Sequence, residues 1–381
     1  MNKILNKQAF LYFLIFLSSI SLLKNCIQAL SWSSDFQWFP STLVLKGINH
    51  YNYFLDGGQP FMSQGGEYSH GMYIILLPFA SLDWQLAKLV WMFFNVFFVI
   101  AIPYLICNKF KIQRHLTIII ICIFATCSPT RTVINYGQQS LFVMFFFILP
   151  FIFQNNKSYF FSGLSFFKYN TGFILPIFYL VEKKYKYLLL SAIPSIVTWI
   201  LYFNITNSNP IINLFEPIKL VLSKNYSWGT DLYSITKSLI NFEKSFMFLT
   251  PEQINSLVSI SITLFLCLIF LIKIIKLKDD LLKLSLISLC TLVLAPHSNY
   301  DFIFLLPLLI FSIKDFNSNK FNFYLIIFYF YFNKIVRHKL GFEVAEINTY
   351  NVCLFLIFFY CLIYNLYKFC KMDNNLKNSE I

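Results

Sequence analysis

The chain has 381 residues, of which 57% are hydrophobic and 12% are charged, and its formal net charge is +13. Soluble domains carry about 25% charged residues, and a chain of this length could not bury so much apolar surface in water. This composition excludes an ordinary soluble protein and predicts an all-α polytopic membrane protein. Its positive residues are expected to set topology and contact lipid headgroups, not nucleic acid.

The N-terminal run MNKILNKQAFLYFLIFLSSISLL is long and has no small-residue cleavage site after it, so we interpret it as a retained first helix. About ten apolar runs are long enough to cross a bilayer when tilted or slightly extended. The expected spans cover residues 10–23, 84–107, 116–130, 140–153, 187–203, 254–275, 281–294, 302–313, 321–336 and 351–367.

Lysine and arginine residues gather in short segments that all fall on one side if both termini are cytoplasmic. Two long polar loops, residues 24–70 and 204–253, then face the periplasm. We therefore expect one integral inner-membrane domain over residues 1–370 and a cytoplasmic tail over 371–381. The first of these loops begins with a lone carboxylate, Asp35, just where the first apolar run ends.

Two apolar stretches do not fit simple spans. GMYIILLPFASL, from Gly71, is too short to cross comfortably and is interpreted as a half-helix. GLSFFKYNTGFILPIFYLVEKKYKY is interrupted in its middle at Lys168 and ends in a basic cluster, so a broken pair of half-helices that returns to the cytoplasm is expected. Interrupted backbone at membrane depth must be buried in protein or line a wet cavity.

Polar residues at the outer boundary of the spans are candidates for a single cleft. They are Asp35, Tyr68, Arg131, Gln138, Gln139, Asn225, Asp231, His297, Asn299 and Asp301, with Lys168 in the interrupted run. Each also has a structural interpretation. Asp35 could cap a helix, Arg131 could meet lipid phosphate, His297 could be a loop histidine, and Lys168 could extend to the interface.

Together these residues match the needs of sugar transfer from a lipid-phosphate donor. A carboxylate must take the proton of the attacking hydroxyl, and cations or hydrogen-bond donors must stabilise the departing phosphate. Asp35 suits the first task, and Arg131, Lys168 and His297 suit the second. The substrate-binding candidates are Tyr68, Gln138, Gln139, Asn225, Asn299 and Asp301.

Five elements, in order from Asp35 to Pro307, resemble glycosyltransferase family 87. They are Asp35 with LKGINHYNY, YSHGMYIILLPFASLDWQLAKLVWMFFN, NYGQQSLFVMFFFILP, SGLSFFKYNTGFILPIFYLVEKKYK and LAPHSNYDFIFLLP. The resemblance implies a GT-C-type transmembrane helix bundle with a periplasmic active site and no cofactor or metal. It implies an inverting hexosyltransferase that uses a polyprenyl-phosphate donor, usually of mannose, with Asp35 as general base and His297 on the donor phosphate.

The expected partners are the polyprenyl-phosphate sugar, a lipid-linked or glycan acceptor, and membrane lipids. The sequence departs from the family pattern at His70, where proline is common, and at KYNTGF around Lys168. Three alternatives stay open: a transporter or flippase, a polymerase or ligase of lipid-linked glycans, and a noncatalytic membrane protein. No inverted repeat supports the first, and no arginine-rich outer loop supports the second.

Overall fold

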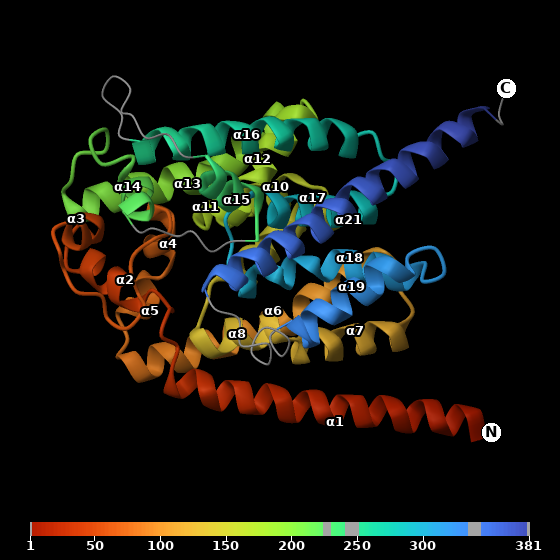
Figure 1. Cartoon of the computed structure of the whole chain (residues 1–381). Helices are drawn as coiled ribbons and strands as arrows, with labels where there is room; N and C mark the ends of the chain where they lie inside the picture. The colour runs from red at the N-terminus through yellow and green to blue at the C-terminus, as the bar shows by residue number, and fades with distance from the viewer. Residues whose placement is uncertain (1, 224–229, 241–250, 334–343, 379–381) are drawn as a thin grey trace. The chain divides into compact units, whose positions relative to one another are not determined.

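The computed structural model describes residues 2–223, 230–240, 251–333 and 344–378 (Figure 1). The structure is 78% helical, and the described residues contain no strand. The prediction of an all-α polytopic membrane protein is therefore confirmed.

Among the described residues, five helices are long and apolar enough to cross a membrane, or up to six if one bent pair is a single span. The five are Gln8–Ser31, Trp84–Lys109, Tyr185–Thr206, Ile254–Ile274 and Tyr350–Lys368. The bent pair, Arg114–Thr126 with Ser128–Tyr136, turns by 55° at its break. The other expected spans fall largely on shorter helices, so the number of helices that cross the bilayer stays a prediction.

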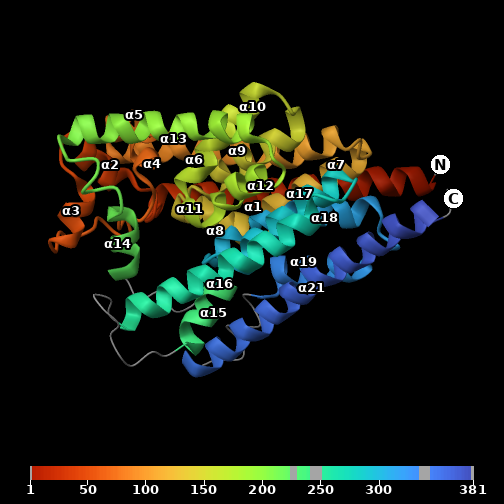
Figure 2. The same ribbon diagram turned by 90° about the horizontal axis from the view of Figure 1, so that it is seen from above.

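The chain packs as two units, of which unit 1 comprises Met1–Gly172 and Lys186–Asn225. Within it, α1 packs along α7 and α3 packs on α14 (Figure 1), and α6 packs on α9 (Figure 2). Its helices are α1 (Asn2–Ser31), α2 (Trp38–Leu45), α3 (His50–Leu55), α4 (His70–Ile75), α5 (Leu77–Ala80), α6 (Trp84–Lys109), α7 (Arg114–Thr126), α8 (Ser128–Tyr136), α9 (Ser140–Phe153), α10 (Asn156–Ser162), η1 (Gly163–Phe167), α11 (Tyr169–Gly172), α13 (Tyr185–Thr206) and α14 (Glu216–Ser223).

Unit 2 comprises Phe173–Tyr185 and Tyr226–Ile381. In it, α17 packs on α18, and α15 packs on α16 (Figure 2). Its helices are α12 (Ile174–Val181), α15 (Leu232–Leu239), α16 (Pro251–Ile274), α17 (Asp280–Leu294), η2 (Asn299–Leu305), α18 (Leu306–Lys314), α19 (Lys320–Tyr331) and α21 (Val344–Asn378). Every residue of α17 from Leu281 to Leu294 except Lys283 is buried, so this helix forms the core of the unit.

Both irregular stretches fold as short helices, and the return of the later one to the cytoplasm stays a prediction. The run from Gly71 folds as the short helices α4 and α5. The later run is interrupted at Lys168, between η1 and α11. A Cβ at position 172 would lie 2.2 Å from the carbonyl oxygen of Ser165, so this tight return of the chain requires glycine.

Candidate active site

Asp35 lies in the turn that follows α1, and this turn is fixed against the end of α8. The backbone N–H of Ser33 donates to the carbonyl of Asn135 at 3.1 Å, and that of Asp35 donates to the carbonyl of Tyr136 at 2.9 Å. The Asp35 side chain is half-buried. Its carboxylate thus has a defined position and keeps some exposure.

Two glutamine amides hold this carboxylate. Nε2 of Gln37 donates to one oxygen of Asp35 at 2.5 Å, and Nε2 of Gln138 donates to the other. Gln37, not Asp35, is the N-cap residue of α2, and no side chain caps that helix. Asp35 is therefore not the N-cap residue of α2, contrary to the capping interpretation. We call Asp35, Gln37 and Gln138 the amide clamp.

The two glutamines are themselves fixed by the segment that precedes α4. The Gln138 oxygen accepts from the hydroxyl of Tyr68 at 2.8 Å, and the Gln37 oxygen accepts from the backbone N–H of Gly66 at 3.2 Å. Both glutamines are buried. Because each amide oxygen is occupied, each amide nitrogen is oriented toward Asp35.

A left-handed glycine brings Gln138 to this position. Gly137 ends α8 with φ +69°, and a Cβ there would lie 3.1 Å from the Cβ of Phe36. The indole N–H of Trp91 donates to the Gly137 carbonyl at 2.8 Å, and the amide of Gln139 donates to the Phe36 carbonyl at 2.6 Å. Gln139 therefore supports the backbone beside Asp35, and its binding to substrate stays a prediction.

The structure places the two cationic candidates of unit 1 differently. Lys168 is buried, and its ammonium donates to the hydroxyl of Ser140 at 2.8 Å, so it lies next to the Gln138–Ser140 segment. Arg131 is exposed on α8, and its guanidinium makes no hydrogen bond or ion pair with another described residue. Lys168 thus lies close to the amide-clamp segment, whereas Arg131 is exposed on α8, and its contact with a phosphate stays a prediction.

His297 belongs to unit 2, in the loop between α17 and η2. Its Nε2 lies 3.3 Å from the hydroxyl oxygen of Thr230, and its ring packs edge-on against Phe302. The backbone N–H of His297 donates to the buried carboxylate of Asp231, which also caps α15 by accepting from Ser234. Burial raises the pKa of Asp231, while His297 and Ser234 oppose that rise.

The remaining candidates have mainly local contacts. Asp301 is buried and forms a capping box with Ser298 at the start of η2. Asn299 is exposed, and its side-chain oxygen accepts from Tyr329 at 3.1 Å. Asn225 lies outside the described residues. The structure therefore groups Asp35, Tyr68 and Gln138 in unit 1, and groups His297 with Asp231 in unit 2.

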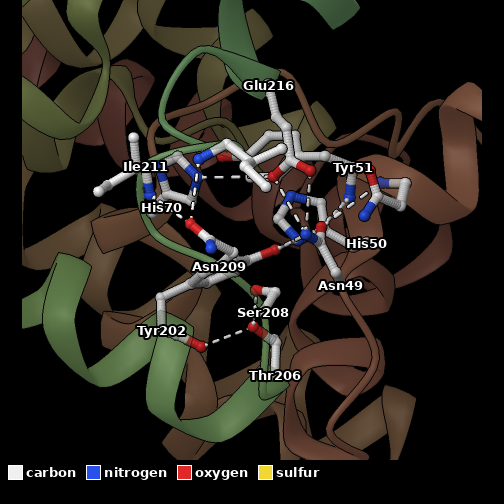
Figure 3. A network of polar contacts seen from close by, with 12 residues as sticks. Asn49, His50, Tyr51, His70, Tyr202, Thr206, Ser208, Asn209, Ile211 and Glu216 are labelled. Carbon is white, nitrogen blue, oxygen red and sulfur yellow. Dashed lines mark hydrogen bonds and ion pairs between the residues drawn. The ribbon is translucent and has the colours of Figure 1, made fainter.

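A second polar cluster in unit 1 was not anticipated from the sequence. Its centre is the Glu216 carboxylate, which is only 2% exposed and accepts from the amide of Asn49 at 3.1 Å (Figure 3). Nε2 of His70 lies 3.9 Å from the same carboxylate. Nδ1 of His50 lies 3.0 Å from the hydroxyl of Tyr202, which donates to the oxygen of Asn49. These five residues are called the Glu216 cluster below.

Burial governs the ionisation of this cluster. It lowers the pKa of His50 well below the ordinary 6.5 and also lowers that of His70, although Glu216 opposes the effect at His70. The hydroxyl of Tyr51 donates to the carbonyl of Tyr68 at 2.5 Å, which joins α3 to the segment holding Gln138. Among the described residues, no three His, Cys, Asp or Glu side chains gather as metal ligands.

The model of glycosyltransferase family 87 matches residues 68–296, which is more than half of the chain. The matched stretch contains Tyr68, Gln138 and Lys168, begins after Asp35 and ends one residue before His297. No match was found among curated proteins or among solved structures. The family match and the many apolar helices agree, and the chain belongs to glycosyltransferase family 87.

Proposed function

We propose that this membrane glycosyltransferase moves a hexose, preferably mannose, from a polyprenyl-phosphate donor to a lipid-linked or glycan acceptor, with inversion at the anomeric carbon. The reaction takes place on the periplasmic side of the inner membrane, and both termini are cytoplasmic. Family membership favours a transferase over the transporter and noncatalytic alternatives.

The amide clamp is the observation that carries this proposal. A general base must be ionised, oriented and open to the hydroxyl that it activates. Asp35 is held through both of its oxygens by neutral amides and is still half-buried, not sealed.

In the proposed step, Asp35 accepts the proton of the acceptor hydroxyl as that oxygen attacks the anomeric carbon of the sugar. The bond between this carbon and the phosphate oxygen breaks, and the polyprenyl phosphate leaves with the bonding electrons. Displacement from the face opposite the phosphate inverts the anomeric configuration. Lys168, Arg131 and His297 are the groups proposed to stabilise the developing negative charge on the phosphate.

The surroundings of His297 suit a phosphate contact. Its backbone is held by Asp231 and its Nε2 faces the hydroxyl of Thr230, so the imidazole is oriented while its side chain stays partly exposed. An oriented donor costs little reorganisation when charge develops on the leaving group. Tyr68 and Gln138 are proposed to line the acceptor side, beside the base.

The test is transfer by the purified full-length protein in lipid nanodiscs. The donors are radiolabelled polyprenyl-phosphate mannose, glucose and arabinose, with a polyprenyl-diphosphate oligosaccharide as the alternative donor class, and an envelope lipid extract supplies acceptors. We expect transfer from a monophosphate donor, with mannose preferred. Transfer only from the diphosphate donor would contradict the proposal and favour a polymerase or ligase, and membrane passage without transfer would favour a flippase.

Two histidine variants, one of them a control, test the role of His297 in the same assay. His297→Ala is expected to raise the donor concentration needed for half-maximal rate, because a phosphate contact is lost. His115→Ala changes an exposed histidine on α7 and is the matched control. Unchanged donor dependence in His297→Ala would remove the phosphate role of this residue.

A further inference from the structure

The segment of residues 209–218, called the 209–218 segment here, has an inverted distribution of polar and apolar side chains. It follows α13 and ends in the first turn of α14. Ile211 is 82% exposed and Ile212 is 68% exposed, and Leu214, Phe215 and Ile218 are also exposed. The carboxylate of Glu216, in contrast, is buried. In water this arrangement would be unfavourable on both counts, since it exposes apolar surface and removes a charge from solvent.

The apolar side chains are presented by a fixed turn. The side-chain oxygen of Asn209 accepts from the backbone N–H groups of Ile211 at 2.9 Å and Ile212 at 3.2 Å. The backbone N–H of Asn213 donates to the Asn209 carbonyl at 3.1 Å. The exposure of the two isoleucines is therefore built into the turn.

Glu216 anchors the segment from its inner side. Its carboxylate accepts from Asn49 at the start of α3 and faces His70 on α4, and Leu220 one turn later is buried as well (Figure 3). Figure 3 shows Asn209, Ile211 and Glu216 around the same polar cluster. One face of the segment is therefore bound to unit 1 through polar contacts, and its apolar side chains are left without protein cover among the described residues.

The position of the segment identifies what covers it. Candidate span α13 ends at Thr206, three residues before the 209–218 segment begins. A Cβ at position 47 would lie 3.4 Å from the carbonyl oxygen of Ile205, which brings exposed Leu45 and Ile48 to this same end of α13. Lys219 is exposed on α14, where a cation suits anionic headgroups.

We infer that the 209–218 segment lies in the headgroup region of the leaflet in which α13 ends, with Ile211, Ile212 and Phe215 inserted into the outer part of the acyl chains. The partner is the bilayer surface itself, and the segment is an interfacial anchor, as short amphipathic segments with an apolar face can be. The inference does not depend on which sugar is transferred or on whether Asp35 is the base.

The test uses the wild-type protein in nanodiscs of phosphatidylcholine and phosphatidylglycerol that contain a photoactivatable phospholipid. One probe carries a diazirine near the headgroup and another carries it at the end of the acyl chain. After irradiation, the label is mapped by peptide mass spectrometry. The 209–218 segment should take several-fold more label from the headgroup-proximal probe than from the terminal probe, whereas α6 should be labelled by both and the exposed loop at residues 56–60 by neither.

A double variant provides the control. Ile211→Ser with Ile212→Ser should lower the label on the 209–218 segment several-fold, while the unchanged label on α6 reports that the protein is still inserted. Wild-type labelling of the segment no higher than that of residues 56–60 would overturn the inference and show that water or a protein partner covers it. Undiminished labelling in the double variant would overturn the assigned role of the isoleucines. Neither result depends on transfer activity.

Discussion

Asp35 and Glu216 are two carboxylates of unit 1 with different surroundings. Both accept hydrogen bonds from side-chain amides, Asp35 from Gln37 and Gln138, and Glu216 from Asn49. Asp35 is half-buried, whereas Glu216 is sealed and faces an imidazole, His70. The comparison separates two tasks that a carboxylate can perform in a membrane protein.

A base must exchange a proton with a substrate, so it has to stay accessible while its orientation is fixed. The amide clamp supplies the orientation through two neutral amide donors. An anchor has the opposite requirement, because a buried acceptor with fixed donors holds two chain segments together. Glu216 holds the 209–218 segment to α3 and α4 in this way. The comparison therefore fits the proposal that Asp35 is the base, and it supports a structural role for Glu216.

Replacing the base should have the largest effect. Asp35→Asn keeps the size of the side chain but cannot accept the acceptor proton, so kcat should fall by about 10²–10⁴-fold, the usual contribution of general base catalysis. The measurement is the transfer rate in nanodiscs, together with the thermal midpoint, which reports the loss of one of the two clamp hydrogen bonds. Asp56→Asn, at an exposed loop position, is the control. An Asp35→Asn protein that transfers at the wild-type rate would remove the proposed mechanism.

Replacing Glu216 should lower the stability of the protein more than its transfer rate. Glu216→Ala leaves the half-buried amide of Asn49 without its acceptor, so the free energy of unfolding should fall by about 1–2 kcal/mol. The thermal midpoint in detergent reports this loss, and the rate per folded molecule should stay near that of the wild type. Glu216→Gln keeps an acceptor oxygen and should lose less. If Glu216→Ala abolished transfer at an unchanged midpoint, the contrast with Asp35 would be wrong.

The clamp can be altered without removing the base. Gln138→Glu keeps an oxygen for the Tyr68 hydroxyl but places a second carboxylate beside Asp35. Like charges disfavour joint ionisation, so the pH at which activity falls to half on the acid side should rise by about one unit. The pH profile of kcat measures this shift, with Gln59→Glu in the exposed loop as control. An unchanged profile would show that Gln138 does not hold the reactive carboxylate.

The sequence contains much of what the comparison needs for Asp35. The sequence places Asp35 and Tyr68 in one predicted outer loop and the Gly137–Gln138 element in another on the same side of the membrane, so these residues could be predicted to share a site. The long helices were also predictable, since their apolar runs are continuous. The role of Gln37 was not predictable from the sequence. It depends on a left-handed backbone at this residue, φ 66°, which no local pattern of residues indicates.

Glu216 was missed for a different physical reason. Its main partner, Asn49, is 167 residues away in the chain, and a carboxylate in a polar loop is ordinarily solvated. The break at Lys168 was expected from the sequence. The tight return that needs Gly172 was not, because it depends on close packing against Ser165. Hydrophobic periodicity gives helices, whereas such long-range pairings depend on tertiary packing.

The smallest expected effect concerns the imidazoles of the Glu216 cluster. The pKa values of His50 and His70 are lowered in the folded protein, so the unfolded chain binds more protons just below pH 6.5. Stability should therefore be complete above about pH 6.5 and fall as the pH drops below it, by on the order of 1 kcal/mol near pH 5.5. The groups that face these imidazoles are Glu216, Tyr51, Tyr73 and Tyr202.

Thermal midpoints between pH 5.5 and 7.5 measure this dependence. Burial raises the pKa of Tyr51 and Tyr73, so neither ionises in that range, and the slope belongs mainly to the two histidines. The double variant His50→Gln with His70→Gln should flatten the slope, while His115→Gln, at an exposed position, should leave it as in the wild type. An unaltered slope in the double variant would mean that other titratable groups cause the pH dependence, and the contrast between a sealed anchor and an accessible base would then rest on Asp35 alone.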